Sequence, residues 1–290
     1  RDADRGGTVT VRIVTDSACD LRGDEVDQYG IEVVPLSIRF GDQEYVDREE
    51  LTVTEFYRLL ADSDELPETA APAPGKFDAA FRRQFDAGAT GVVCINLSAA
   101  LSATMQSAQT AADNLKSETP DANLHVVDSR SITAGLGSIV IAAARMGADG
   151  ASAAEIVAAV EGMSGRTQVY GALDTLDNLK KGGRIGGAQA LLGSMLSIKP
   201  IIDISSGEVE EAGKQRTRKK ALAWLRDKLT EVGPVENLAV MHGDAPDIDT
   251  FLEMISDIVD LDSIRIEKIG PVVGTHGGPR VMGIAFQTPA

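Results

Sequence analysis

The sequence predicts an α/β unit followed by an α+β unit. Between residues 9 and 146, short apolar runs alternate with segments of helical spacing, which is typical of a mostly parallel sheet with helices on both faces. After residue 166, helices are interspersed with strands, two of them joined by a tight turn, which favours a mixed or antiparallel sheet. A chain of 290 residues is long enough for two domains. We therefore expect an N-terminal domain over residues 9–165 and a C-terminal domain over 166–290.

Residues 1–8 are set apart from this fold. The opening RDADRGG is polar and ends in glycines, so we interpret it as a disordered tail or a remnant of cloning. The chain shows no signal peptide and no run approaching the roughly 18 apolar residues of a membrane span. Cys19 and Cys94 adjoin strand-like runs and are predicted to be reduced packing residues, as expected of a cytoplasmic protein.

The charge balance excludes several classes of partner. Lys and Arg number 28 against 44 Asp and Glu, which gives a net charge of −16. Nucleic acids and anionic membranes attract clustered basic side chains, so neither nucleic-acid binding nor stable membrane insertion is expected. An apolar content of 43% and a charged content of 25% are typical of a soluble globular protein.

The first strand is predicted over Val9–Thr15, which is rich in Val and Ile. Ser17 and Asp20 follow its end, where open α/β sheets bind ligands, although either residue fits equally well as the cap of the next helix. A second apolar run, Ile31–Phe40, reaches a Gly-Asp turn and leads back over Glu44–Val46, which indicates a hairpin.

Two helical patterns flank a proline-rich segment. Thr52–Leu60 begins with a capping threonine and has Glu three residues later, which is typical of a capping box. Lys76–Ala87 places three phenylalanines on one face, which favours a core-facing helix. Leu66–Gly75 lies between them and contains three prolines. Because proline restricts the backbone, we predict a stiff loop there, with Thr69 as its one hydroxyl.

A strand, a hydroxyl-rich loop and a helix follow one another in Val92–Ala108. Val92–Ile95 is a short apolar run, the loop carries Ser98 and Ser102, and helical spacing resumes around Thr104. A helix start leaves backbone N–H groups unpaired and carries the positive end of the helix dipole, so this stretch fits an anion site. The alternative is that Ser102 only caps the helix.

The remaining elements follow from the same spacing rules. Leu124–Val127 is a predicted strand, and Ser131–Met146 and Ser152–Met163 are predicted helices, the second closed by Gly165. In the second half we predict strands over 167–172, 200–204, 208–211, 237–242, 263–269 and 281–287, and helices over 175–181, 218–232, 248–257 and one that ends near 197.

Several enzyme signatures are missing from the sequence: it has no GxxxxGK[ST], GxGxxG, GxSxG, HExxH or CxxC. No metal or cofactor is expected. Lys180, Lys181 and Arg184 surround a Gly-Gly turn after a helix, which fits a solvated turn or a partner contact. Among the three histidines, His276 alone lies in a segment rich in Gly and Pro, residues 270–279, which predicts a shaped loop. Its imidazole suits either hydrogen bonding to a carboxylate or general-base catalysis.

Six of these motifs, taken in order, resemble one protein family. They are TDS near the start, a Thr beside a proline-rich segment, LSAALSAT before a helix, LKKGGRI, IKPI and GPVVGTHGGP. The set is similar to that of the DegV family of bacterial fatty-acid-binding proteins, over about residues 9–290. The resemblance implies an N-terminal α/β domain, a C-terminal α+β domain and a long-chain fatty acid buried between them. In the best understood members, the protein presents this fatty acid to a separate fatty acid kinase for phospholipid synthesis.

The resemblance also assigns residues to the site. It places the fatty-acid carboxylate on Thr69, Ser102 and His276. Neighbouring hydroxyls in the same motifs complete the set of candidate ligand residues: Thr275, Ser98 and Thr104. Ser98 is expected mainly to fix its loop. No nucleophile is needed for binding, so we expect a carrier without catalytic activity.

A carrier of this kind needs a docking surface for the kinase, to which we assign Lys180, Lys181 and Arg184.

Two alternative functions remain open. One is an acyl-transfer enzyme that uses Ser102 as nucleophile and His276 as base. The other is a lipid-responsive sensor whose ligand state is recognised by a protein partner; no DNA-binding motif supports a direct transcriptional role.

The chain departs from the family pattern at positions near the implied pocket. Alanines replace serines in the proline-rich segment, an alanine and a methionine replace the usual glycine and aromatic residue of the second serine motif, and the last motif ends differently. The positions are Ala70, Ala71, Ala73, Ala103, Met105 and 278–280. These changes leave the three carboxylate contacts in place, but they leave open the shape of the pocket, and hence the length and unsaturation of the fatty acid.

Overall fold

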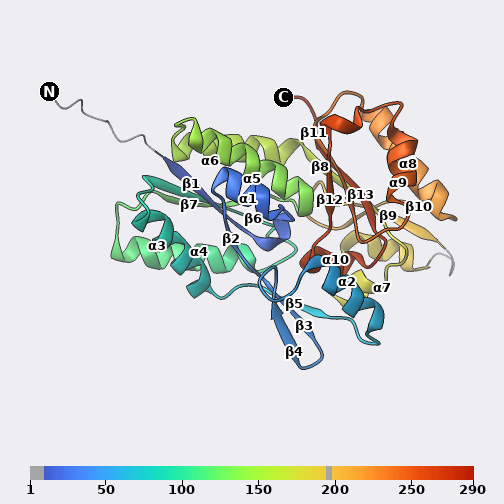
Figure 1. Ribbon diagram of the computed structural model, residues 1–290, viewed down its shortest axis with the longest axis horizontal. Coiled ribbons are helices and arrows are strands. Elements are labelled where there is room, and N and C mark those ends of the chain that lie inside the picture. Colours follow the sequence, from blue (N-terminus) through green and yellow to red (C-terminus); the bar gives the residue numbers. More distant parts are fainter. Residues whose placement is uncertain (1–9, 194–197) are drawn as a thin grey trace.

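The computed structural model describes residues 10–193 and 198–290, and its strands form three sheets (Figure 1). The predicted tail over residues 1–8 and the end of the helix expected near residue 197 lie outside the described residues. Within the described ranges, no helix combines the length and the apolar character that crossing a bilayer requires.

The first sheet is parallel throughout, as the alternation of strands and helices predicts. Its strand order is β2-β1-β6-β7, and every neighbouring pair is parallel. The strands span Val11–Asp16 (β1), Glu32–Val34 (β2), Gly91–Asn96 (β6) and Leu124–Asp128 (β7).

Different helices cover the two faces of this sheet (Figure 1). Along β6, Val92 and Cys94 pack against α3 and α4, whereas Val93 and Ile95 belong to the core on the opposite face, with α5 and α6. This alternation follows from the two-residue period of a strand. The helices span Gly23–Tyr29 (α1), Pro74–Asp86 (α3), Thr104–Glu118 (α4), Thr133–Ala148 (α5) and Ala153–Arg166 (α6).

The second sheet is mixed, which confirms the α+β pattern of the second half. Its order is β10-β9-β8-β13-β11-β12, and only the β11–β12 pair is parallel. The strands span Thr167–Ala172 (β8), Lys199–Asp203 (β9), Glu210–Gln215 (β10), Glu236–His242 (β11), Arg265–Lys268 (β12) and Met282–Gln287 (β13). Helices α8 (Arg218–Val232) and α9 (Ile248–Ile255) pack on one face over buried Leu225, Phe251 and Phe286.

Helix α5 lies between the two sheets. It contacts β1 of the first sheet and β8, β11 and β13 of the second. Gly147 permits part of this packing, because a Cβ there would lie 2.4 Å from the carbonyl oxygen of Val11. One continuous core includes Val93 from the first sheet and Met241 from the second. The domain boundary predicted after residue 165 falls close to the junction of α6 and β8 and stays a prediction.

A small antiparallel sheet of order β4-β3-β5 completes the fold. Its strands span Ser37–Phe40 (β3), Gln43–Val46 (β4) and Glu68–Ala70 (β5). The hairpin predicted from the Gly-Asp turn is confirmed, because β3 and β4 pair antiparallel on either side of it. The apolar run over Ile31–Phe40 divides around Pro35, which lacks an N–H group, into β2 and β3 of different sheets. The stiff loop predicted over Leu66–Gly75 is wrong around Thr69, because that residue pairs with Ile38 of β3.

The remaining differences between the predicted and observed elements lie at helix ends. The capping box at Thr52 is confirmed at the start of α2 (Val53–Asp62). Gly165 does not close α6, since the helix continues to Arg166 and the chain then passes directly into β8. The remaining short helices are η1 (Ser17–Cys19), α7 (Asp177–Lys181), η2 (Gly186–Gly193) and η3 (Leu261–Ser263).

The loop predicted over residues 270–279 contains a helix, α10 (Pro271–Gly277). Gly270 is its N-cap, and Pro271 stands at a position where the missing N–H group is not needed. Gly278, with φ of 80°, ends it. Gly270, Pro271 and Gly278 therefore mark helix boundaries, and His276 lies in the last helical turn.

Candidate functional site

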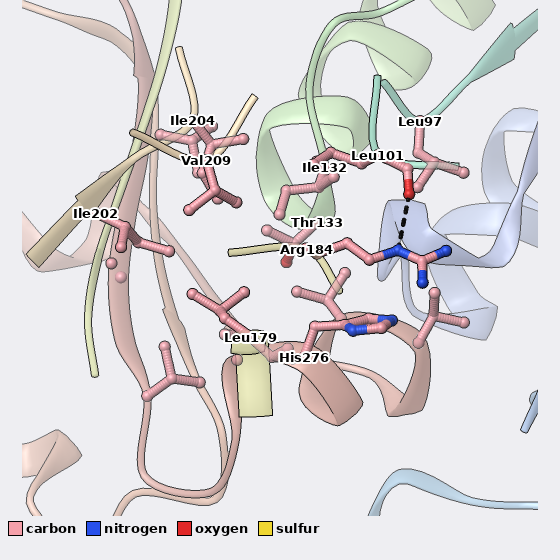
Figure 2. Close-up of a pocket in the computed structure, with 18 of the residues that line it drawn as sticks. Leu97, Leu101, Ile132, Thr133, Leu179, Arg184, Ile202, Ile204, Val209 and His276 are labelled. Atoms are coloured by element: carbon pink, nitrogen blue, oxygen red, sulfur yellow. Dashed lines mark hydrogen bonds between the residues drawn. The ribbon is translucent and has the colours of Figure 1, made fainter. Parts of the chain in front are cut away.

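An apolar cavity lies between the second sheet, the start of α5, α7 and α10 (Figure 2). The volume that the centres of water molecules can reach inside the cavity is about 90 Å³, so the cavity has room for several waters. Its walls are mainly aliphatic side chains from both halves of the chain, among them Leu36, Leu97, Ile132, Leu179, Ile202, Ile204, Val209 and Val272. Figure 2 shows Arg184 and His276 beside each other near Leu101, with Ile202, Ile204 and Val209 toward the opposite end.

Thr69 and His276 meet at the polar end of this cavity. The Thr69 Oγ1 atom lies 3.0 Å from His276 Nε2, although 207 positions separate the two residues in the sequence. Pairing of β5 with β3 holds Thr69, and α10 holds His276. Two residues that the sequence places in separate loops are thus brought together by a strand and a helix.

His276 is neutral at pH 7. Burial, and then the positive charge of Arg184, lower the pKa of its imidazole to about 4. The buried Nδ1 atom has no hydrogen-bond partner within the described residues. Gly182 packs against it so closely that a Cβ there would lie 2.3 Å from Nδ1. A neutral imidazole donates through one nitrogen and accepts through the other, so the Thr69 hydroxyl can either donate to Nε2 or accept from it.

Ser102 is half-buried and lines the same cavity. Its hydroxyl lies 2.8 Å from the Thr104 hydroxyl and accepts a hydrogen bond of 3.3 Å from the Thr104 N–H. It therefore accepts from the first amide of α4 and also lines the cavity, but the N-cap of α4 is Ala103, so the interpretation of Ser102 as the cap is wrong. Its hydrogen bonds are to Thr104, whereas the His276 ring bonds Thr69, so the Ser102–His276 hydrogen bond of a nucleophile and its base is not formed.

Arg184 differs most from its predicted place. It donates from Nε to the carbonyl oxygen of Leu101 at 3.2 Å and from Nη1 to that of Gly182 at 2.8 Å. It lines the cavity and also an outer depression that includes Ser102. Lys180 and Lys181, which were grouped with it from the sequence, are exposed at the end of α7 and do not line the cavity.

Three of the predicted ligand hydroxyls do not line the cavity. Ser98 is buried and donates to the carbonyl oxygen of Gly207 at 2.5 Å, which ties its loop to the second half of the chain. Thr275 donates to the carbonyl oxygen of Pro271 at 2.8 Å within α10. Thr104 is fully buried beneath Ser102. These three hydroxyls lie outside the cavity lining and stabilise the segments that carry the lining residues.

Two further residues shape the site without a clear signal in the sequence. Asn178, which is buried in α7, donates to the carbonyl oxygen of Thr275 at 3.1 Å. The Tyr57 hydroxyl donates to the carbonyl oxygen of Ile269, just before α10, at 2.9 Å. Helical and strand spacing do not indicate that either residue holds α10 in place. Across residues 10–193 and 198–290, no group of three His, Cys, Asp or Glu side chains is arranged to hold a metal ion.

The fold and the cavity define a class: an α/β protein of two main sheets that contains an apolar pocket with one polar end. A sequence model described as "Uncharacterised protein, DegV family" matches residues 10–288. The chain belongs to the DegV family. A DegV domain-containing protein of Streptomyces coelicolor is 35% identical over 285 residues, covering 96% of this chain and 98% of that protein.

Solved structures agree with this assignment. A DegV family protein from Thermus thermophilus, described as fatty acid binding, superposes with a TM-score of 0.87 at 30% identity, covering 97% of this chain and 100% of that one. A stearic-acid-binding protein from Eubacterium ventriosum has a TM-score of 0.87 at 28% identity, with 96% and 98% covered. DegV from Bacillus subtilis, a fatty acid binding protein, has a TM-score of 0.82 at 28% identity, with 97% and 100% covered.

Proposed function

We propose that the protein binds a long-chain fatty acid in the apolar cavity, with the carboxylate on Thr69, Ser102 and His276. The observation that carries this proposal is the single polar end of an otherwise aliphatic cavity, where an imidazole and a threonine hydroxyl from distant segments lie 3.0 Å apart. The fatty acids described for the T. thermophilus and E. ventriosum relatives support it.

The chemistry of the two ends suits such a ligand. Each CH₂ group buried by the tail contributes about 0.8 kcal/mol. A buried carboxylate needs several donors to offset its loss of hydration, and hydroxyl, imidazole and guanidinium groups supply them. A carboxylate beside His276 also favours the protonated imidazole, so binding should raise the pKa of this ring from about 4.

We also propose that the protein is a cytoplasmic carrier without catalytic activity. It presents the carboxylate of its fatty acid to a fatty acid kinase, which phosphorylates it. The outer depression lined by Ser102 and Arg184 gives that kinase an approach to the carboxylate. Lys180 and Lys181 are exposed beside Arg184 and suit an acidic partner. Dividing the chain at 165/166 places the ligand between the two proposed domains.

Native mass spectrometry of protein purified without added lipid tests the binding proposal. The expected result is a mass increment of one fatty acid of 14 to 20 carbons, lost after delipidation and regained with palmitate or oleate. A preparation that carries no lipid and takes up neither fatty acid would overturn the proposal.

Charge reversal tests the docking surface. Lys180→Glu with Lys181→Glu should slow acyl-phosphate formation by a cognate fatty acid kinase and leave palmitate affinity unchanged. Lys219→Glu with Lys220→Glu, an exposed basic pair on α8, is the matched control. Equal rates for the two double variants would remove these lysines from the kinase interface.

A further inference from the structure

One buried carboxylate lies at the starts of two helices that border the cavity, α5 and α10. Asp20 is 5% exposed and follows η1 with φ of 50°, a conformation that Asp tolerates better than most residues. A Cβ on Gly270, the N-cap of α10, would lie 2.4 Å from its Oδ1 atom. Thr133, the first residue of α5 and part of the cavity wall, faces the same carboxylate. The amide of Gly270 and the hydroxyl of Thr133 both favour the ionised form of Asp20, although neither reaches it at full hydrogen-bond geometry.

Helix α10 depends on contacts of this kind for its position. It has seven residues, too few to be stable alone, and its first turn leaves backbone N–H groups unpaired. Above its pKa of about 7, Asp20 supplies a negative charge at this positive end. Tyr57 holds the carbonyl just before α10, and Asn178 holds the carbonyl of Thr275 at its far end. His276 follows Thr275, so these contacts decide where the imidazole lies.

Asp20 also belongs to a group of three buried carboxylates, with Asp16 and Asp47. Burial raises the pKa of Asp20 to about 7 and the pKa values of Asp16 and Asp47 to about 6. The positive charge of Arg48 opposes the rise at each of the three carboxyl groups. Arg48 donates to the carbonyl oxygens of Leu21 and Ser17. Its guanidinium is thereby held beside the cluster and favours ionised Asp20.

We infer that Asp20 is a positioning residue for the carboxylate end of the ligand: its negative charge at the start of α10 fixes the place of His276 relative to Thr69. The inference rests on the proposed fatty-acid function. Asp47 provides a contrast, because it is equally buried and shares Arg48, but the groups that stabilise its charge are Ser17 and Arg48 and none belongs to α10.

The test compares Asp20→Asn with Asp47→Asn, using two ligands that share a tail, palmitate and 1-hexadecanol. Asp20→Asn should weaken palmitate binding by about tenfold and change hexadecanol binding by less than about twofold. The reason is that a hydrogen bond from His276 to a charged carboxylate contributes more than one to a neutral hydroxyl. Asp47→Asn should leave the ratio of the two affinities unchanged. Equal losses for both ligands in Asp20→Asn, or equal ratios in the two variants, would overturn the inference.

The titration of His276, followed by NMR, gives a readout that does not depend on lipid. A displaced α10 exposes the imidazole, so Asp20→Asn should raise its pKa from about 4 toward the ordinary 6.5, whereas Asp47→Asn should not. With three histidines in the chain, the signals can be assigned from single variants. If the parent protein binds no palmitate, the proposed function fails, but this titration still decides the role of Asp20.

A second variant covers the case in which Asp20→Asn does not fold. Gly270 has φ of −74°, which alanine also adopts, so the strain in Gly270→Ala comes only from the approach to Asp20. It should reproduce the selective loss of palmitate affinity and the raised pKa of His276. A Gly270→Ala protein with the parent affinity ratio and the parent titration would contradict the inference.

Discussion

The two ends of the cavity are built in different ways. The polar end takes one side chain from each of four segments that are distant in the sequence: β5, the loop before α4, the turn after α7, and α10. The apolar end takes Ile202, Ile204 and Val209 from one stretch around β9 and the turn that follows it. The contrast teaches that affinity and orientation have separate sources. In the proposed function, the tail supplies most of the binding free energy at the aliphatic walls, whereas recognition of the carboxylate depends on the whole fold being formed.

Shortening the ligand tests the apolar end and should give the largest effect. Replacing palmitate by octanoate removes eight CH₂ groups at about 0.8 kcal/mol each, so affinity should fall roughly 4 × 10⁴-fold. Isothermal titration calorimetry on delipidated protein measures it, with 1-octanol and 1-hexadecanol as the matched pair without a carboxylate. Affinities for octanoate and palmitate within tenfold of each other would show that the aliphatic end does not hold the tail.

The pH dependence of stability tests the electrostatics of the polar end. The pKa of His276 is about 4 in the folded protein and about 6.5 when unfolded, so the unfolded chain binds the extra proton between these values. His276 should therefore destabilise the protein as pH falls from 6.5 to 4, by up to about 3 kcal/mol, and the loss should level off below pH 4.

The measurement is the free energy of unfolding of the parent and of His276→Gln at pH 4 and pH 7. The difference between the two proteins isolates His276 from the buried aspartates, whose raised pKa values act in the opposite direction. His125→Gln, which alters a less buried imidazole, is the control. A parent-to-variant difference that is independent of pH would mean that His276 titrates normally.

Removing one hydroxyl from the polar end should have a smaller effect. Thr69→Val deletes the partner of His276 Nε2 and keeps the shape of the side chain. Palmitate affinity should fall about tenfold, since a hydrogen bond to a charged group contributes about 1.5 kcal/mol or more. Thr230→Val, on the exposed side of α8, controls for loss of a hydroxyl. An unchanged affinity for palmitate in Thr69→Val would remove Thr69 from the site.

A change behind the polar end should give the smallest effect. Gly182→Ala places a methyl group against His276 Nδ1, so the ring must tilt away from Thr69, and we expect a loss of roughly threefold in palmitate affinity. At Gly187 a Cβ would meet only ordinary contacts at 3.5 Å, which makes Gly187→Ala the matched control. Identical affinities for the two variants would mean that Nδ1 does not need this clearance.

Local signals explain how much of the fold could be predicted. The capping boxes at Thr52 and Ser152 each satisfy a helix start within four residues, and the helices begin where the sequence places them. The segment around His276 misled the prediction, because Gly270, Pro271 and Gly278 serve as helix boundaries while the same residue types also form loops. Packing against α7, α2, β3, β5 and η1 decides between the two.

The site was less accessible to prediction than the fold. The contact between Thr69 and His276 joins residues 207 positions apart, and no local pattern encodes such a pairing. Resemblance to a family could therefore suggest both residues, but spacing could not. Arg184 shows the converse, because its side chain turns inward to the carbonyl of Leu101 while the neighbouring lysines stay exposed. A run of basic residues says nothing about which one points inward.

The position of α5 between the two sheets limits how the gene can be divided. Its buried face contacts β8, β11 and β13 as well as β1, and its glycine at position 147 fits directly against the first strand. A fragment ending at residue 165 would present that face to water, and a fragment beginning at 166 would lose the cover of its sheet. Expressed separately, both pieces should aggregate; expressed together, they should assemble into one soluble complex.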